Sequence, residues 1–134
     1  MKTTFYILVL MLLTLSCNSD DSQQNIEPTP NSPWSLVNVS GGLAGVDDDF
    51  EIGLITWDFN PNNSELTVTN NNTANVVYDG FPTGAYDYEV ITQTNGDMSV
   101  IINSFSYNIT SLSATQLILD EGVLADGFLL TFSR

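Results

Sequence analysis

The sequence contains no histidine, one cysteine, one lysine and one arginine. Without histidine, neither a serine or cysteine triad nor an imidazole metal centre can be assembled. The one lysine, Lys2, lies at the start of the chain, so a mature protein without that segment cannot form a Schiff base. A glycine-rich phosphate loop and a nucleophile elbow are also missing. We therefore expect a protein that is not an enzyme and that holds no cofactor.

Basic charge is also scarce, with 16 acidic residues against 2 basic ones. Removal of residues 1–16, which include Lys2, would leave 16 acidic residues and Arg134, and so a net charge of −15. Binding to a phosphate backbone needs clustered Lys and Arg for counterion release. This composition excludes nucleic acid as a partner and favours solubility.

The N-terminal segment has the order of features of a secretory signal. Lys2 supplies a positive charge, residues 5–15 are almost entirely apolar, and Ser16 and Cys17 follow. A membrane-spanning helix needs about 20 apolar residues, and this run is much shorter. The pattern predicts a signal peptide at residues 1–16 that is cleaved and not retained as an anchor.

Residues 13–17, Leu-Thr-Leu-Ser-Cys, resemble the lipobox of bacterial lipoproteins, in which cleavage occurs before an acylated cysteine. The resemblance implies that Cys17 carries fatty acyl chains and anchors the protein to a membrane, since several chains together bind a bilayer stably. Ser19, Asp20 and Asp21 resemble the acidic signal that exports such lipoproteins to the surface of the outer membrane. The alternative for Cys17 is a small apolar residue within an ordinary cleaved signal. The alternative for Ser19, Asp20 and Asp21 is a solvated acidic start to a linker.

A polar segment follows Cys17. Residues 18–32 contain Ser, Gln, Asn, Asp and prolines, with Ile26 as the one large apolar residue. Such a segment buries too little apolar surface to offset its ordering entropy. We expect residues 17–32 to form a disordered linker, and a single domain to occupy residues 33–134.

Apolar residues alternate with polar ones through most of that domain, and turn residues separate the alternating segments. Ile55, Trp57 and Phe59 form one such set, and Tyr86, Tyr88 and Val90 form another. We expect residues 45–49 to be a loop, residues 76–78 a short strand, and Asn95–Gly96 a tight hairpin turn. The pattern predicts an all-β domain of about eight antiparallel strands. A sandwich and a barrel both fit, and the short connections favour a single up-and-down β-barrel.

Four segments resemble the lipocalin-like domain of secreted bacterial lipoproteins of the Bacteroidota type: Trp34 on the first strand, Gly53–Phe59, Gly84–Tyr88, and Asp126–Arg134. The resemblance covers residues 33–134 and implies the barrel fold. It also implies that Arg134 lies over the ring of Trp34, a cation–π contact that would join the last strand to the first. The alternative is that Arg134 is a frayed terminal residue.

The most useful candidates for a binding site are aromatic. The set expected to point inward consists of Trp57, Phe59, Tyr86, Tyr88, Phe105, Tyr107, Phe128 and Phe132. An eight-stranded barrel is either filled by side chains or holds one small ligand. So many rings favour a mostly filled core, with Trp57, Tyr86, Tyr88 and Tyr107 lining any shallow pocket at the mouth.

Acidic residues offer weaker candidates. Asp47, Asp48, Asp49 and Glu51 have the oxygen ligands that calcium prefers, but they lack the spacing of an EF-hand, and a solvated loop is the simpler interpretation. Asp58, Asp87 and Glu89 would be the carboxylates of a glycosidase, which needs two acids about 5–10 Å apart in a cleft.

Together these observations lead to a functional hypothesis. The chain is expected to be a lipoprotein anchored to the outer membrane of the cell envelope through Cys17, binding a small apolar or neutral ligand or an envelope protein. The alternative is a structural or interaction module of an outer-membrane complex, with a solid core and no ligand cavity.

Overall fold

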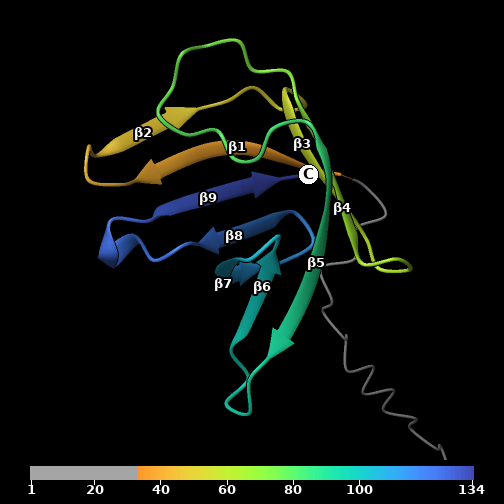
Figure 1. The fold of residues 1–134 in the computed structure, drawn as a ribbon. Coiled ribbons are helices and arrows are strands. Elements are labelled where there is room, and N and C mark those ends of the chain that lie inside the picture. Colours follow the sequence, from red (N-terminus) through yellow and green to blue (C-terminus); the bar gives the residue numbers. More distant parts are fainter. Residues whose placement is uncertain (1–32) are drawn as a thin grey trace, which may run out of the picture.

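The structure, a computed structural model, describes residues 33–134 as one antiparallel β-barrel (Figure 1). The strands are β1 (Trp34–Gly41), β2 (Val46–Asp49), β3 (Ile55–Asn60), β4 (Glu65–Asn70), β5 (Gly84–Thr92), β6 (Met98–Ile102), β7 (Phe105–Leu112), β8 (Gln116–Asp120) and β9 (Phe128–Ser133), and a short 3₁₀ helix, η1 (Val123–Ala125), precedes β9. Within residues 33–134, no helix is long and apolar enough to cross a membrane.

The sheet closes because β1 pairs with strands on both of its edges. One edge pairs with β9, and the other pairs with β2 through Asn38–Gly41 and with β3 through Trp34 and Ser35. β2 and β3 therefore occupy one position in the barrel, interrupted at residues 50–54, and the barrel has eight strand positions in up-and-down order. Closure leaves the sheet without a long free edge. The predicted fold class is confirmed.

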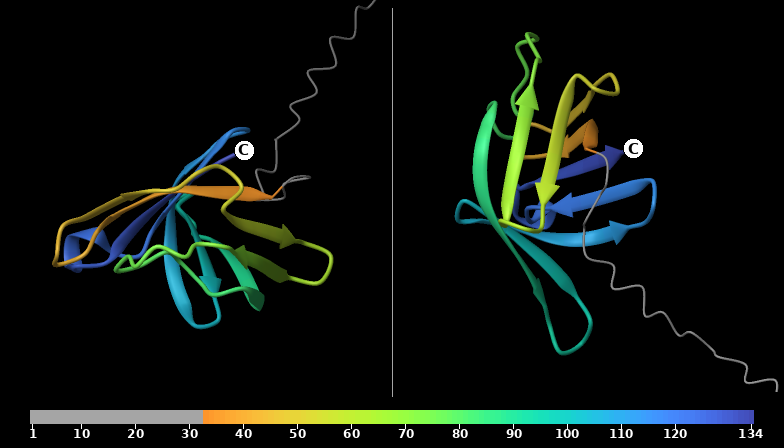
Figure 2. Two further views of the ribbon diagram at one scale, coloured as in Figure 1. Left: turned by 90° about the horizontal axis from the view of Figure 1, so that it is seen from above. Right: turned by 90° about the vertical axis from the view of Figure 1, so that its right-hand side faces the viewer.

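The two ends of the barrel differ (Figures 1 and 2). We call one the terminal end, where residue 33, the turns at residues 61–64, 93–97 and 113–115, and Arg134 lie. The opposite end, which we call the capped end, carries the turns at residues 42–45 and 103–104, the segment 121–127, and residues 71–83 between β4 and β5. A chain that enters at residue 33 therefore reaches the domain from the side opposite to its long loops.

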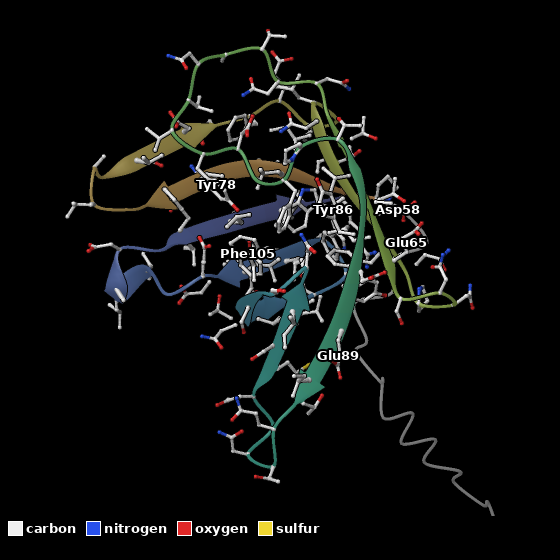
Figure 3. The ribbon with its side chains drawn as sticks, viewed as in Figure 1. Asp58, Glu65, Tyr78, Tyr86, Glu89 and Phe105 are labelled. Carbon is white, nitrogen blue, oxygen red and sulfur yellow. The ribbon has the colours of Figure 1, made fainter. Side chains whose placement is uncertain are left out.

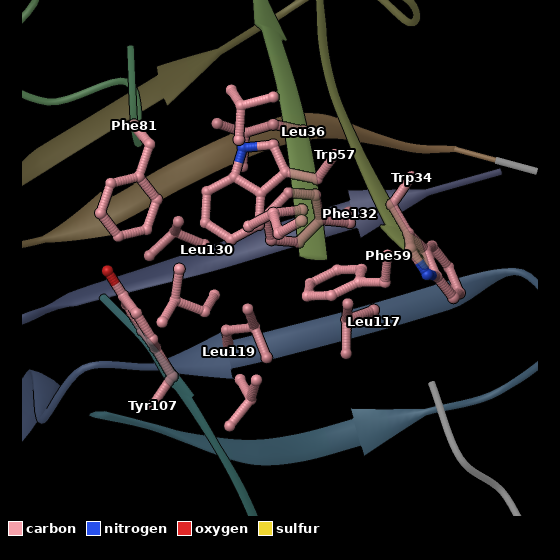
Figure 4. Close-up of a cluster of buried hydrophobic side chains, with 14 of the residues drawn as sticks. Trp34, Leu36, Trp57, Phe59, Phe81, Tyr107, Leu117, Leu119, Leu130 and Phe132 are labelled. Carbon is pink, nitrogen blue, oxygen red and sulfur yellow. The ribbon is translucent and has the colours of Figure 1, made fainter. Parts of the chain in front are cut away.

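Alternation along the strands builds the core. Ile55, Trp57 and Phe59 are buried, whereas Asp58 and Asn60 on the same strand are exposed. The core consists of Trp34, Leu36, Val39, Ile55, Trp57, Phe59, Leu66, Val68, Phe81, Val100, Ile102, Tyr107, Leu117, Leu119, Leu130 and Phe132. These side chains fill the space that a larger barrel would leave for a ligand (Figure 4).

Two sequence expectations about elements are wrong. Residues 46–49 form β2 and not a loop, because their backbone pairs with β1 and the Asn38 amide donates to Asp47 Oδ1 at 2.9 Å and Asp49 Oδ1 at 3.0 Å. Residues 76–78 are not a strand; they belong to the long β4–β5 connection. The predicted hairpin at Asn95–Gly96 is present, with Gly96 at φ +91°.

Candidate functional site

The most distinctive feature of the barrel is the segment that covers one of its ends. We call residues 71–83 the capping loop. The Asn72 side-chain amide donates to Asp79 Oδ2 at 3.0 Å, and Thr83 Oγ1 accepts from the Asn70 backbone N–H at 2.9 Å. These bonds tie the two ends of the loop to each other and to β4. The loop is thus a compact Ω-type closure, packed by its own side chains.

Phe81 is the residue of the capping loop that enters the barrel, and it is 8% exposed. Its ring centroid lies 5.4 Å from that of Trp57 and 6.5 Å from that of Tyr107 (Figure 4). It also lies 4.8 Å from the ring centroid of Tyr86. Such tilted and edge-on ring pairs contribute beyond simple burial. Phe81 therefore occupies the position at the mouth where a ligand of an open barrel would bind.

Beside Phe81, the loop contributes a buried polar contact. The hydroxyl oxygens of Tyr78 and Tyr107 lie 3.3 Å apart, and the Tyr78 ring stacks on Phe128 with centroids 4.6 Å apart. Burial raises the pKa of both tyrosines above the ordinary value near 10, and the neighbouring Tyr78 raises that of Tyr107 further. Both hydroxyls are neutral at physiological pH, so they are suited to hydrogen bonding and not to acid–base chemistry.

The indole nitrogen of Trp57 is the other buried polar atom under the loop. Trp57 is fully buried, and its Nε1 has no hydrogen-bond partner among residues 33–134. Gly80 of the capping loop lies directly above it, because a Cβ at Gly80 would be 3.2 Å from Trp57 Cζ2. The close approach of loop and ring leaves no room for a ligand between them.

The four predicted ligand-binding aromatics thus have structural contacts. Trp57 and Tyr107 are fully buried in the core. The Tyr86 hydroxyl donates to the Pro82 carbonyl at 2.8 Å, and Tyr88 packs edge-on against Phe59 with centroids 5.1 Å apart. Comparisons with known protein families, with curated proteins and with solved structures find no match. The site is therefore interpreted from its own geometry.

One member of the predicted inward set lies less deeply than expected. Phe105 is half exposed at the rim of the capped end, and its ring packs edge-on against that of Phe81 with centroids 5.8 Å apart. Sequence reasoning missed Phe81 as an interior residue because a loop residue follows no period. The proline and glycines around Phe81 marked only a turn.

The predicted contact between the first and last strands is present. Arg134 Cζ lies 4.1 Å from the centroid of the Trp34 ring, and Trp34 is fully buried. Arg134 also donates from Nε to the Ala114 carbonyl at 2.8 Å. The terminal end is therefore held by a cation over an aromatic face together with a hydrogen bond to the β7–β8 turn.

A shallow, open pocket lies at the terminal end, beside the start of β6 and the end of β7. Its volume is about 240 Å³, and its lining comprises Gly96, Asp97, Met98, Ile109, Thr110, Ser111 and Leu112. Met98 and Ile109 are cross-strand partners and only partly buried. The pocket can accept a small apolar group and offers little charge to hold a polar one.

The acidic candidates lie on the outside. Asp47 and Asp49 are exposed and bonded to the Asn38 amide, and within residues 33–134 no group of three or more acidic or cysteine side chains is placed to hold a metal ion. Asp58, Asp87 and Glu89 are exposed on β3 and β5. Figure 3 shows Asp58 and Glu89 directed away from the interior. The three residues provide no cleft with two facing carboxylates. Cys17, Ser19, Asp20 and Asp21 lie outside the described residues, as do the expected signal peptide and linker.

Proposed function

We propose that this protein is a membrane-anchored lipoprotein of the cell envelope, not an enzyme, whose barrel serves as an interaction module with a solid core. The filled interior under the capping loop carries this proposal, because Phe81, Trp57 and Tyr107 occupy the volume that a ligand would need. The lipocalin-like pattern of the strands supports a binding role, and the N-terminal segment with Cys17 supports the anchor.

The proposal is tested by asking whether the barrel takes up small apolar molecules. Benzene and indole are titrated into the full chain, and their binding is followed by NMR. The wild-type interior is expected to show no saturable shifts at Trp57 or Tyr107. Phe81→Ala provides the positive control, since removal of a buried phenyl ring leaves a dry cavity that can bind such molecules. Saturable binding inside the wild-type barrel would contradict the proposal.

The anchor is tested by mass spectrometry of the protein recovered from the cells that produce it. The expected mature chain begins at Cys17 and carries several fatty acyl chains, the number that holds a protein stably on a bilayer. An unmodified thiol at Cys17, or a mature chain that begins elsewhere, would contradict this part of the proposal.

A second function, binding of a small apolar ligand, is favoured by the pocket beside Met98 and Ile109. In the same titration it predicts saturable shifts at these two residues, with no change at Trp57. Met98→Gln should abolish those shifts, because a side-chain amide replaces the apolar wall. Shifts that persist in Met98→Gln would exclude this pocket as the ligand site.

A further inference from the structure

The capped end collects most of the exposed large apolar side chains of residues 33–134. Leu43 is 87% exposed, Val77 is 68% exposed, and Leu124 is fully exposed. Val123 and Phe105 are also exposed at this end, whereas only Ile52 and Ile91 among the exposed large apolar residues lie elsewhere. Exposed apolar groups that gather in one region of a soluble surface mark an interaction site more often than scattered ones.

The loops that carry these side chains are tied to each other. The Gly42 N–H donates to the Gly127 carbonyl at 3.0 Å, which joins the turn at residues 42–45 to the segment 121–127. The stacking of Tyr78 on Phe128 joins the capping loop to the start of β9, directly after that segment. Figures 1 and 2 show the three loops on the same side of the molecule. We call Leu43, Val77 and Leu124 the apolar tip.

Leu124 lies on a hydrogen-bonded turn. The Asp120 carboxylate accepts from the N–H groups of Gly122 and Val123, each at 2.7 Å, and the Ala125 N–H donates to the Gly122 carbonyl at 2.7 Å. A backbone that is fixed before binding loses less entropy when it binds. Binding of another surface to Leu124 therefore costs little backbone entropy.

The charge around the apolar tip is of one sign. Asp79 lies in the capping loop, Glu121 and Asp126 flank η1, and Asp47 lies on β2 beside the turn at residues 42–45. Arg134, the one basic residue of the domain, lies at the opposite end of the barrel. A surface that binds this end must therefore bring positive charge to the rim and apolar groups to the centre.

We propose that the capped end docks onto a protein partner that presents an apolar patch bordered by Lys and Arg. This inference rests on the proposed function and names the kind of partner. A second copy of the chain fits poorly, since a symmetric contact would place these carboxylates against their own copies. An anionic bilayer would repel them as well, because peripheral membrane segments rely on basic side chains. The chain enters the domain at residue 33, at the terminal end. The capped end, on the opposite side of the barrel, is therefore free to face a partner.

Site-specific photo-crosslinking in the cells that produce the protein tests the docking surface. Leu43→p-benzoyl-phenylalanine places the probe within the apolar tip of the full chain, and Asn62→p-benzoyl-phenylalanine places it at the terminal end. The Leu43 probe should give one heteromeric adduct, and mass spectrometry should locate it in an apolar partner segment flanked by Lys or Arg. The Asn62 probe should not give this adduct.

Charge substitutions in the tip provide the second readout. Leu124→Asp and Val77→Asp should each lower the yield of the adduct about tenfold or more, as expected for loss of a central contact. Ile91→Asp is the matched control, because Ile91 is exposed but lies near the end of β5, beside the turn at residues 93–97 at the terminal end. It should leave the yield unchanged.

Several outcomes would overturn the inference: an adduct of twice the chain mass, an adduct with lipid, equal yields from both probe positions, no adduct, or no effect of the tip substitutions. The docking inference and the proposed function fail separately. Uptake of benzene by the wild-type interior would contradict the solid core and leave the crosslinking pattern unaffected. If the wild-type barrel binds neither benzene nor indole and the expected crosslinks are also missing, only the docking surface is contradicted.

Discussion

At the scale of single residues, Arg134 and Trp34 join the last strand of the barrel to the first. The guanidinium lies over a ring that is otherwise fully buried, and Nε is bonded to the Ala114 carbonyl. The contact uses the one cation of the domain at the place where β9 meets β1. The contact therefore joins the first and last strands at the terminal end, where no long loop covers the barrel.

Replacement of Arg134 by alanine should therefore lower stability. Loss of an exposed cation–π contact costs about 0.5–1 kcal/mol, and loss of the hydrogen bond to Ala114 adds to it. Urea unfolding followed by tryptophan fluorescence measures the change. Arg134→Lys keeps the charge and should recover part of the loss. An unchanged free energy of unfolding in Arg134→Ala would show that the contact does not stabilise the fold.

The Tyr78–Tyr107 pair predicts a pH dependence. Because burial raises both pKa values above the unfolded value near 10, the pair contributes its full stability below about pH 10 and loses it as the pH rises beyond that value. The free energy of unfolding should fall above about pH 10. Tyr107→Phe should weaken this decline, whereas Tyr86→Phe, which removes a different hydroxyl, should retain it. Equal declines in all three proteins would contradict the assignment.

At the scale of elements, the capping loop decides whether the barrel is open or solid. It has no regular secondary structure, yet it contributes Phe81 to the core and Tyr78 to the stack on Phe128. Gly80 allows this, since its φ of +85° is strained for any other residue and a Cβ there would lie only 3.2 Å from Trp57 Cζ2. A single backbone position thus sets the distance between loop and core.

Gly80→Ala should be more destabilising than its matched control, Gly53→Ala. Both glycines have nearly the same positive φ, +85° and +84°, but a Cβ at Gly53 would meet nothing within 4 Å. The control therefore measures the backbone strain of about 1 kcal/mol alone, and Gly80→Ala adds the contact with Trp57. Thermal unfolding measures both. Equal losses would mean that the loop adjusts freely over Trp57.

A like-charge pair on the outer wall offers a stabilising change. Glu65 on β4 and Asp87 on β5 are directly opposite each other, and such pairs are unfavourable. Asp87→Lys should raise the free energy of unfolding by about 0.2–1 kcal/mol at low salt. Glu89→Lys makes the same charge change on the same strand opposite Ile101, so the difference between the two variants isolates the pair. No difference between them would contradict the prediction.

The elements that could be predicted from the sequence are those whose period is local. Tyr86, Tyr88 and Val90 alternate with Asp87 and Glu89, and this alternation suffices to place a strand. β2 escaped prediction because three consecutive aspartates are poor strand formers until β1 and the Asn38 amide are beside them. The positions of Phe81 and of the apolar tip could not be predicted either, because they also depend on tertiary contacts. Their environment is created by loops that meet only after the barrel closes.

At the scale of the whole molecule, the domain carries thirteen acidic residues and one arginine. Their mutual repulsion opposes the compact state, and salt screens it. The melting temperature should therefore rise between about 0.01 and 0.5 M sodium chloride, by about 4–8 °C for each kcal/mol gained. Differential scanning calorimetry measures the shift. A melting temperature that falls over this range would show that attractive charge pairs dominate.

The pairing of β1 on both edges also has a mechanical consequence. If Cys17 is the anchor, as proposed, tension from the membrane would enter the domain at residue 33 and act along the axis of β1. The hydrogen bonds to β9 on one edge and to β2 and β3 on the other would then be loaded in shear and share the force, whereas a strand pulled sideways breaks its bonds one at a time. The proposed anchor would thus attach the barrel through a strand that is paired on both edges.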